Sequence, residues 1–490
     1  MLWTIFLLLH GLLIVLYLYS SRRRQKNEPP LDKGFLPWLG HALEFGKDAT
    51  KFLARMKGKH GDIFTVCAAG HYVTVLLDPN SFDSVLSDTV CLDFNPIRKK
   101  LIKRIFGVHL PTVKPASQRK WMEQHFQGVS LWKLSSSMNA HLHRLLLNNH
   151  EVCSPSEWTQ DGLFSLCYSL LFRAGYLTLF EIKENPSAVY KEFRKFDELL
   201  TKLARGSLTR GESKVANTCK EQLWELLSPN WLNGRLESNS WQQSYHQFLQ
   251  EEGIDADMQK KALLLQLWTT QCNAGPAAFW VLGFLLTHPE AMEAVQSEIR
   301  ILSTLQDTSL QHPPANLLEA HSTPVFDSVL KETLRLTAAI MINREVMQDK
   351  ILRMADGREY RLRRGDRVCL FPFVSPQMDP QIHQEPQMFK YDRFLNEDKT
   401  VKDAFYKDGK RLKYYTLPWG AGRNSCVAKE FAVTAIKQFV LLLLTHFDLE
   451  LCHPEAKLPP ANPSRCGFGM LQPDGDLMVR FRLKRTWHEM

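Results

Sequence analysis

A cysteine near the carboxyl end of the chain is the residue best suited to chemistry. Cys426 closes a glycine-rich run, residues 418–426 (PWGAGRNSC), in which Gly420 and Gly422 allow tight turns and close backbone approaches. An apolar stretch comes next and predicts a helix, so Cys426 would lie at a helix N-terminus, where the dipole and free N–H groups favour a thiolate. A thiolate can be an axial ligand of iron, although a cysteine in this position, taken alone, is more often structural.

Charged residues upstream of this loop form a second pattern. Thr323 and Pro324 are typical of an N-cap and a first helical position. The helix that they open carries Glu332 and Arg335, three residues apart and therefore on one face. Arg393 comes later in an aromatic-bounded run, before the cysteine loop. In isolation the first pair would be a surface ion pair, but the order of all these motifs is distinctive.

This ordered set resembles the cytochrome P450 superfamily, and the resemblance covers nearly the whole chain after its first residues. It implies a mainly α fold with a small β-region, and Cys426 as the metal ligand, the proximal axial ligand of the iron of haem b. It also implies that Glu332, Arg335 and Arg393 form a buried ionic network that braces the haem-binding core. The cofactor contacts implied by the resemblance are Cys426, Asn424, Arg344, Arg119, Trp419 and Gly420. Asn424 and Ala428 depart from the basic residue and the glycine that are usual there.

The helix expected to cross the distal haem face departs from the pattern of oxygen-activating members. Those members carry an acid and an alcohol where this chain has Ala277 and Ala278. Reductive scission of dioxygen consumes protons, and an acid with a neighbouring hydroxyl is the relay that delivers them. Its absence favours a substrate that already contains a peroxide bond over monooxygenation.

Pro276 predicts a defect in the same helix, because it cannot donate to the carbonyl of Cys272. That carbonyl would then be free where a ligand could bind. Asn273 could donate a hydrogen bond to a substrate oxygen near the iron. Alternatively, its side chain could hydrogen-bond the backbone groups that the helix defect leaves unpaired, and the sequence does not favour either interpretation. Gly275 could simply be a packing glycine. The predicted substrate contacts are Asn273, Trp268, Ala274, Ile340 and Asn343.

The resemblance narrows on three runs, residues 36–44, 271–280 and 405–413, to a branch of the family that isomerises a lipid endoperoxide. It implies conversion of prostaglandin H2 to prostacyclin, with Cys426 and Asn273 as catalytic residues and with no external electrons or dioxygen. Cyclooxygenase would supply the substrate, and no reductase would be required. Ile340 and Asn343 stand where a proline and a threonine are expected in the substrate-contact strand.

Two alternative functions remain open. A sterol or lipid monooxygenase of the same fold would need a reductase, for which Arg423, Lys429 and Lys437 could form a basic docking face, although such residues are usually a solvated surface. A non-catalytic haem carrier or sensor in a membrane is the second alternative. The large apolar helical region between residues 100 and 300 favours an enclosed substrate cavity instead.

The N-terminal residues predict where the protein is located. Residues 1–21 are almost wholly apolar and predict a transmembrane anchor, with a buried first helix as the alternative. Basic residues come at once in the linker, residues 22–30, which also contains two prolines, and the positive-inside rule places the rest of the chain in the cytosol. Residues 31–490 would form a single haem-thiolate domain, so we expect a single-pass protein of the endoplasmic reticulum membrane.

Composition supports a folded enzyme and predicts its elements. The 490 residues are 44% hydrophobic and 23% charged, which excludes wholesale disorder. A formal net charge of +9 over this length is weak evidence for a nucleic-acid partner, and we expect none. The ten cysteines show no zinc-site spacing and should mostly be reduced and buried. Periodicity predicts helices over 52–57, 190–203, 258–286 and 427–447, strands over 63–67, 72–77 and 368–371, and a hairpin turn at 356–357.

Overall fold

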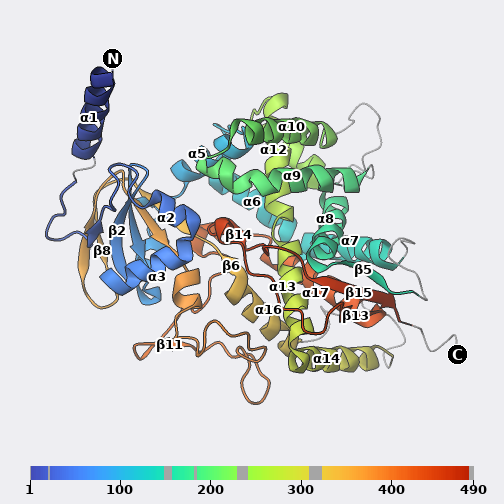
Figure 1. Cartoon of the computed structure of the whole chain (residues 1–490). Coiled ribbons are helices and arrows are strands. Elements are labelled where there is room, and N and C mark those ends of the chain that lie inside the picture. The colour runs from blue at the N-terminus through green and yellow to red at the C-terminus, as the bar shows by residue number, and fades with distance from the viewer. Residues whose placement is uncertain are drawn as a thin grey trace.

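The fold is mainly helical, with a smaller β-rich part on one side (Figure 1). The computed structural model describes residues 2–19, 22–147, 157–180, 185–228, 241–307 and 323–484. All cysteines in these ranges are free thiols, and most are buried. The remaining cysteine, Cys153, lies outside the described residues. The order and number of helices and strands confirm the predicted mainly α fold class with a small β-region.

The helices and strands alternate irregularly along the chain. The α-helices are α1 (Leu2–Tyr19), α2 (Ala42–Lys47), α3 (Ala49–His60), α4 (Asp83–Leu86), α5 (Asn95–Phe106), α6 (Pro115–Phe126), α7 (Gly128–Leu147), α8 (Leu163–Leu179), α9 (Pro186–Arg205), α10 (Arg210–Leu226), α11 (Trp241–Glu251), α12 (Ala256–Gln271), α13 (Ala274–Thr287), α14 (Pro289–Asp307), α16 (Pro324–Thr337) and α17 (Lys429–His446). The strands are β1 (Leu31–Asp32), β2 (Ile63–Ala68), β3 (His71–Leu76), β4 (Leu92–Asp93), β5 (Thr159–Gly162), β6 (Ala338–Ala339), β7 (Ile342–Val346), β8 (Lys350–Arg353), β9 (Glu359–Leu362), β10 (Arg367–Leu370), β11 (Tyr406–Lys407), β12 (Lys410–Arg411), β13 (Phe447–Leu451), β14 (Gly469–Met470) and β15 (Met478–Leu483).

The largest sheet has the strand order β1-β2-β3-β10-β7-β4. Strands β2 and β3 form an antiparallel hairpin, whereas β10 pairs with β3 in parallel from far along the chain. Strand β7 pairs antiparallel with β10 on one side and with the short strand β4 on the other. The predicted strands near residues 63–77 and 368–371 are confirmed, as is the hairpin of β8 and β9 around Gly357.

Helix α13 runs through the middle of the helical part and packs against α8, α16 and α17 (Figure 1). The periodicity predicts one continuous helix over 258–286, but the structure breaks it into α12 and α13. Because α13 begins at Ala274, Pro276 lies in its first turn, where a missing N–H is tolerated. Pro276 therefore marks the start of a second helix and not a defect inside one.

Gly275 allows α13 to approach α8 closely. A Cβ atom at Gly275 would lie 2.6 Å from Cδ2 and 2.7 Å from Cα of Tyr168. The second of these atoms is backbone and cannot rotate away. Gly275 is therefore required for packing, in agreement with its interpretation as a packing glycine.

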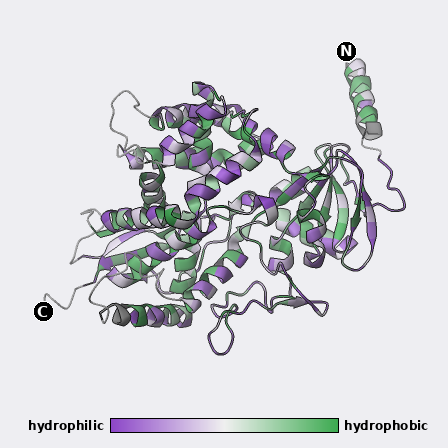
Figure 2. Cartoon of the chain, turned by 180° about the vertical axis from the view of Figure 1, so that it is seen from behind, coloured by the Kyte–Doolittle hydropathy of each residue, from purple (hydrophilic) through white to green (hydrophobic). Residues whose placement is uncertain are grey.

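Helix α1 stands apart from the remainder of the chain and is largely hydrophobic (Figure 2). The sequence predicts that residues 1–21 span a membrane. None of the helices within the described residues has both the length and the apolar character that a membrane crossing needs.

The linker after α1 is attached to the β-rich part. Arg22 Nη1 donates to both carboxylate oxygens of Asp366, at 2.7 and 2.6 Å. Glu28 is almost fully buried and pairs with Arg363. The basic residues that the sequence associates with membrane topology are thus partly used in ion pairs with the body of the protein.

Replacement of Gly275 by alanine tests the close approach of α13 to α8. We expect Gly275→Ala to lower the free energy of unfolding by about 1–3 kcal/mol, because the added methyl group overlaps the backbone of Tyr168. Gly58→Ala is the matched control, since Gly58 lies inside α3 with no heavy atom near its Cβ position. The control should be neutral or stabilising by up to about 1 kcal/mol. Equal thermal-unfolding midpoints for the two variants would contradict the packing role.

Candidate active site

The loop before α17 presents the thiol of Cys426. Gly420 and Gly422 adopt left-handed conformations, with φ of +70° and +64°, and the N–H of Cys426 donates to the carbonyl of Trp419 at 2.8 Å. Among the described cysteines, Cys426 is the exposed one. Helix α17 begins at Lys429, so the cysteine lies three residues before the helix and not at its first residue.

Arg119 on α6 supports this loop from outside. Its Nη1 donates to the carbonyl oxygens of Arg423 and Ser425, at 2.8 and 3.2 Å, and its Nε donates to Glu123 at 2.7 Å. The guanidinium group therefore contacts the backbone directly before Cys426. Arg119 holds the loop, which is a different contact from the predicted one to the cofactor.

The surroundings of the thiol act on its pKa in opposite directions. Desolvation by the neighbouring protein raises the pKa of Cys426 above its ordinary value, whereas the N–H of Ala428 and the charges of Arg119 and Lys429 lower it. The balance is a raised pKa, even though part of the cysteine is accessible to solvent. The N–H of Ala428, directly before α17, favours the thiolate as the sequence predicts, but desolvation outweighs it for the free thiol.

Glu332, Arg335 and Arg393 lie together in the interior. Glu332 and Arg335 are fully buried, and Arg335 donates to both oxygens of Glu332 at 2.7 and 2.8 Å. The Nε of Arg393 lies 2.9 Å from each of the same oxygens, and the N–H of Lys390 donates to one of them at 3.1 Å. A buried carboxylate between two guanidinium groups is satisfied on both charge and hydrogen bonding.

Gln377 connects this network to the cysteine loop. Arg335 Nη1 donates to the carbonyl of Gln377 at 2.7 Å, and the Gln377 amide donates back to the carbonyl of Arg335 at 2.9 Å. The side-chain oxygen of Gln377 accepts from the N–H of Leu417, at 3.4 Å, directly before the loop. Sequence reasoning missed Gln377, since an isolated glutamine carries no pattern that predicts full burial.

Arg344 is a buried cation on β7. It is 5% exposed, its Nη1 donates to the carbonyl of Asn343, and burial lowers its pKa, partly offset by Asp93. Within the described residues, no carboxylate forms an ion pair with it. Successive side chains alternate across a strand, so Asn343 points to the opposite face of β7 from Arg344.

The residues present fit a haem. An accessible thiol on a glycine turn can ligate iron, and a buried guanidinium group without a carboxylate partner suits an anionic substituent such as a propionate. Asn424 is exposed in the same loop and, in the described part of the chain, its side chain has no hydrogen-bond partner. Cys426 and Arg344 would hold the group, with Trp419, Gly420 and Asn424 beside the ligand.

Asn273 lies at the break between α12 and α13 and is partly buried. Its Oδ1 accepts from the N–H of Met470 on β14 at 3.0 Å. The amide therefore does not patch its own helix, and its Nδ2 is left without a partner among the described residues. Trp268, five residues earlier, packs at a tilt against Phe106, with ring centroids 5.7 Å apart, and its indole N–H has no hydrogen-bond partner among the described residues.

The other distal positions are accounted for by packing. Ala277 and Ala278 are 2% and 0% exposed, so the two alanines fill the positions of the missing acid and alcohol. The carbonyl of Cys272, which Pro276 cannot bond, lies 3.4 Å from the hydroxyl of Tyr168. The prediction that this carbonyl is free for a ligand is therefore wrong. Ala274 is partly exposed, and Ile340 lies between β6 and β7, partly buried.

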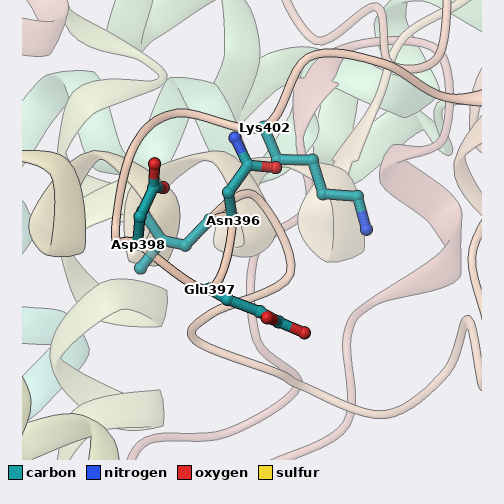
Figure 3. Close-up of a pocket in the computed structure, with 5 residues that line it drawn as sticks. Asn396, Glu397, Asp398 and Lys402 are labelled. Carbon is teal, nitrogen blue, oxygen red and sulfur yellow. The ribbon is translucent and has the colours of Figure 1, made fainter.

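A hollow of about 520 Å³ lies elsewhere on the surface, at residues 395–398 and Lys402 (Figure 3). The carboxylates of Glu397 and Asp398 point away from one another in it. Asn396 and Asp398 hydrogen-bond Thr400 within the same loop. None of these residues belongs to the cysteine loop or to α13, so the hollow is not part of the candidate site.

Comparison with known proteins agrees with this fold and site. The family described as cytochrome P450 matches residues 254–479. Prostacyclin synthase of Rattus norvegicus is 50% identical over 481 residues, covering 94% of this chain and 95% of the relative, and that of Homo sapiens is 48% identical with the same coverage. The 7-alpha-hydroxycholest-4-en-3-one 12-alpha-hydroxylase of Homo sapiens is 41% identical over 475 residues, covering 95% of each.

The chain belongs to the cytochrome P450 family. It is an enzyme of that family, and the family implies a haem-thiolate cofactor. Two of the relatives are named for prostacyclin synthesis and one for hydroxylation of a sterol, so family membership alone does not determine the reaction.

Removal of the central carboxylate tests the buried network. We expect Glu332→Gln to lower the free energy of unfolding by about 3–5 kcal/mol, because two buried guanidinium groups lose their counter-charge. Glu385→Gln is the control, since Glu385 pairs with Lys390 at the surface, and it should leave the free energy of unfolding almost unchanged. Chemical denaturation measures both. Similar losses for the two variants would contradict the bracing role of Glu332.

Proposed function

We propose that the protein is an isomerase that converts prostaglandin H2 to prostacyclin at a haem b ligated by Cys426. The observation that carries the proposal is the distal helix, in which Ala277 and Ala278 are buried and Asn273 presents an unpartnered amide Nδ2 among the described residues. At these two positions the helix has no acid or alcohol to relay protons for dioxygen scission. The relatives named prostacyclin synthase, about 50% identical, support the same reading.

The haem, when bound through the thiolate, supplies a ferric iron able to split a peroxide bond. Isomerisation conserves the atoms and electrons of the substrate, so neither dioxygen nor a reductase is required. A lipid endoperoxide is the substrate, and cyclooxygenase is its upstream source. The protein binds no nucleic acid in this function.

The chain's own residues position the substrate and exclude water. Asn273 Nδ2 donates a hydrogen bond to an endoperoxide oxygen, because Oδ1 is already used by Met470. The indole N–H of Trp268 offers a second donor, and Ala274 leaves room beside Asn273. Ile340 completes the substrate contacts from the segment that joins β6 to β7, whereas Asn343 lies on the face of β7 opposite Arg344 and so points away from the site.

A sterol or lipid monooxygenase is the second candidate, favoured by relatives of that class at about 41% identity. It would need a reductase at the basic residues near the cysteine loop. Lys437 is paired with Asp327 and Lys429 with Glu430, which leaves Arg423 as the unpaired member of that group among the described residues. This pairing makes the basic docking face weaker than the sequence indicates.

For location, we propose that the protein works at the endoplasmic reticulum membrane with its catalytic part in the cytosol. The exposed apolar side chains of α1, among them Trp3 and Leu8, support association with a lipid surface. The ion pairs of Arg22 and Glu28 would keep the catalytic part close to that surface.

The proposal predicts turnover by the purified ferric protein alone. We expect prostacyclin to form from prostaglandin H2 without reductase or reduced nicotinamide, as measured by mass spectrometry of its stable hydrolysis product. Asn273→Ala should lower kcat about a hundredfold, because one positioned donor is lost. Asn396→Ala, the same change on a surface loop, should have no effect.

Three results would count against this proposal or part of it. Turnover of a lipid that strictly required reductase and reduced nicotinamide would support the hydroxylase. Unchanged kinetics of Asn273→Ala, with only a lower thermal-unfolding midpoint, would limit Asn273 to a structural contact. A carbon monoxide difference spectrum of the histidine-ligated type would remove Cys426 as the ligand.

A further inference from the structure

A loop near the carboxyl end determines how the amide of Asn273 points. This loop, residues 462–472, contains β14, which pairs with β6 directly before Ile340. Its Met470 N–H donates to Asn273 Oδ1 at 3.0 Å. Gly469 has a φ of +99°, and a Cβ atom there would lie 2.5 Å from the same Oδ1. The amide orientation of Asn273 therefore depends on the placement of this loop.

A single buried carboxylate on α9 holds both ends of the loop. Asp197 is 0% exposed. Its Oδ1 accepts from Arg465 Nη2 at 3.0 Å, and its Oδ2 accepts from the Gln472 amide at 2.8 Å. Arg465 Nη1 also donates to the backbone carbonyl of Asp197 at 3.1 Å. Met470 lies between these two anchored positions.

The same carboxylate approaches the helix break by a second route. The hydroxyl of Tyr168 lies 3.5 Å from Asp197 Oδ2 and 3.4 Å from the carbonyl oxygen of Cys272, the residue before Asn273. Arg194 donates to Oδ2 at 3.1 Å, and its guanidinium group lies 4.6 Å from the centroid of the Tyr168 ring. Asp197 is thus connected to Asn273 through the loop on one side and through Tyr168 on the other.

The charge of Asp197 is maintained although it is buried. Burial opposes ionisation, but the guanidinium groups of Arg465 and Arg194 outweigh it, and the pKa of Asp197 is lowered. An ionised carboxylate accepts hydrogen bonds at both oxygens, whereas an amide in its place offers one acceptor and would turn a donor toward Arg or Gln.

We propose that Asp197 is a positioning residue, which fixes the loop 462–472 and so directs the Nδ2 of Asn273 toward the substrate oxygen. This role rests on the proposed endoperoxide isomerase. Asp197 does not touch the substrate, and its effect passes through Asn273.

A double-mutant cycle in the haem-loaded full chain tests the role. We expect Asp197→Asn to lower kcat for prostaglandin H2 roughly tenfold or more, with KM changed less than about twofold, because a small displacement of a positioned donor is costly. In the Asn273→Ala background the same substitution should have no further effect on kcat. Glu198→Gln is the control, since Glu198 is exposed and contacts Arg194 but not the loop. This variant should match the wild type.

A brace without a positioning role gives a different pattern. An equal loss of kcat for Asp197→Asn in both backgrounds would overturn the proposal, and so would an unchanged kcat in the wild-type background. If Asp197→Asn does not fold, Gln472→Leu takes its place. This variant removes the hydrogen bond from Gln472 to Asp197, keeps the ion pair of Arg465 with Asp197, and is judged by the same kcat comparison. A wild-type protein that converts no endoperoxide would overturn the proposed function itself, and this role with it.

Discussion

The buried carboxylate of Glu332 is the constraint on which the site depends. It is shared by Arg335 and Arg393, and Arg335 in turn bonds the backbone of Gln377. Gln377 then holds Leu417, directly before the cysteine loop. A chain of buried charged and amide groups has few alternative arrangements, because each unpaired member would cost free energy. The loop that carries Cys426 is therefore connected to residues almost a hundred positions earlier, and Arg119 also bonds the backbone of this loop.

The distal side obeys a related principle. The helix is interrupted between α12 and α13, and the polar groups at the break find partners on other elements. The hydroxyl of Tyr168 lies near the carbonyl of Cys272, and the N–H of Met470 donates to the amide oxygen of Asn273. One donor on Asn273 is thereby left over within the described part of the chain, beside two alanines that cannot relay protons. In the proposed reaction the polar group at the distal face orients a peroxide oxygen and does not deliver protons.

Much of this arrangement could be predicted from the sequence where local patterns carry the information. Such patterns occur in the cysteine loop, in the Glu332–Arg335 spacing, in the helices and in the central strands. The sequence also allows Gly275 to be interpreted as a packing glycine. The roles of Gln377, Asp197 and Tyr168 could not be predicted, because each acts through a partner far away in the chain. Tyr168 lies in an apolar helix, where the sequence does not distinguish it from an ordinary core residue. The raised pKa of Cys426 and the loop contacts of Arg119 also depend on tertiary packing.

The fate of oxygen tests the central claim most directly. The haem-loaded protein is incubated with prostaglandin H2, a P450 reductase, reduced nicotinamide and dioxygen labelled with ¹⁸O, and the product is analysed by mass spectrometry. An isomerase gives prostacyclin, which has the mass of its substrate and is detected as a hydrolysis product heavier by one unlabelled water, with no ¹⁸O from dioxygen and no nicotinamide oxidation linked to turnover. Incorporation of one ¹⁸O atom for each nicotinamide oxidised would contradict the isomerase and identify a monooxygenase.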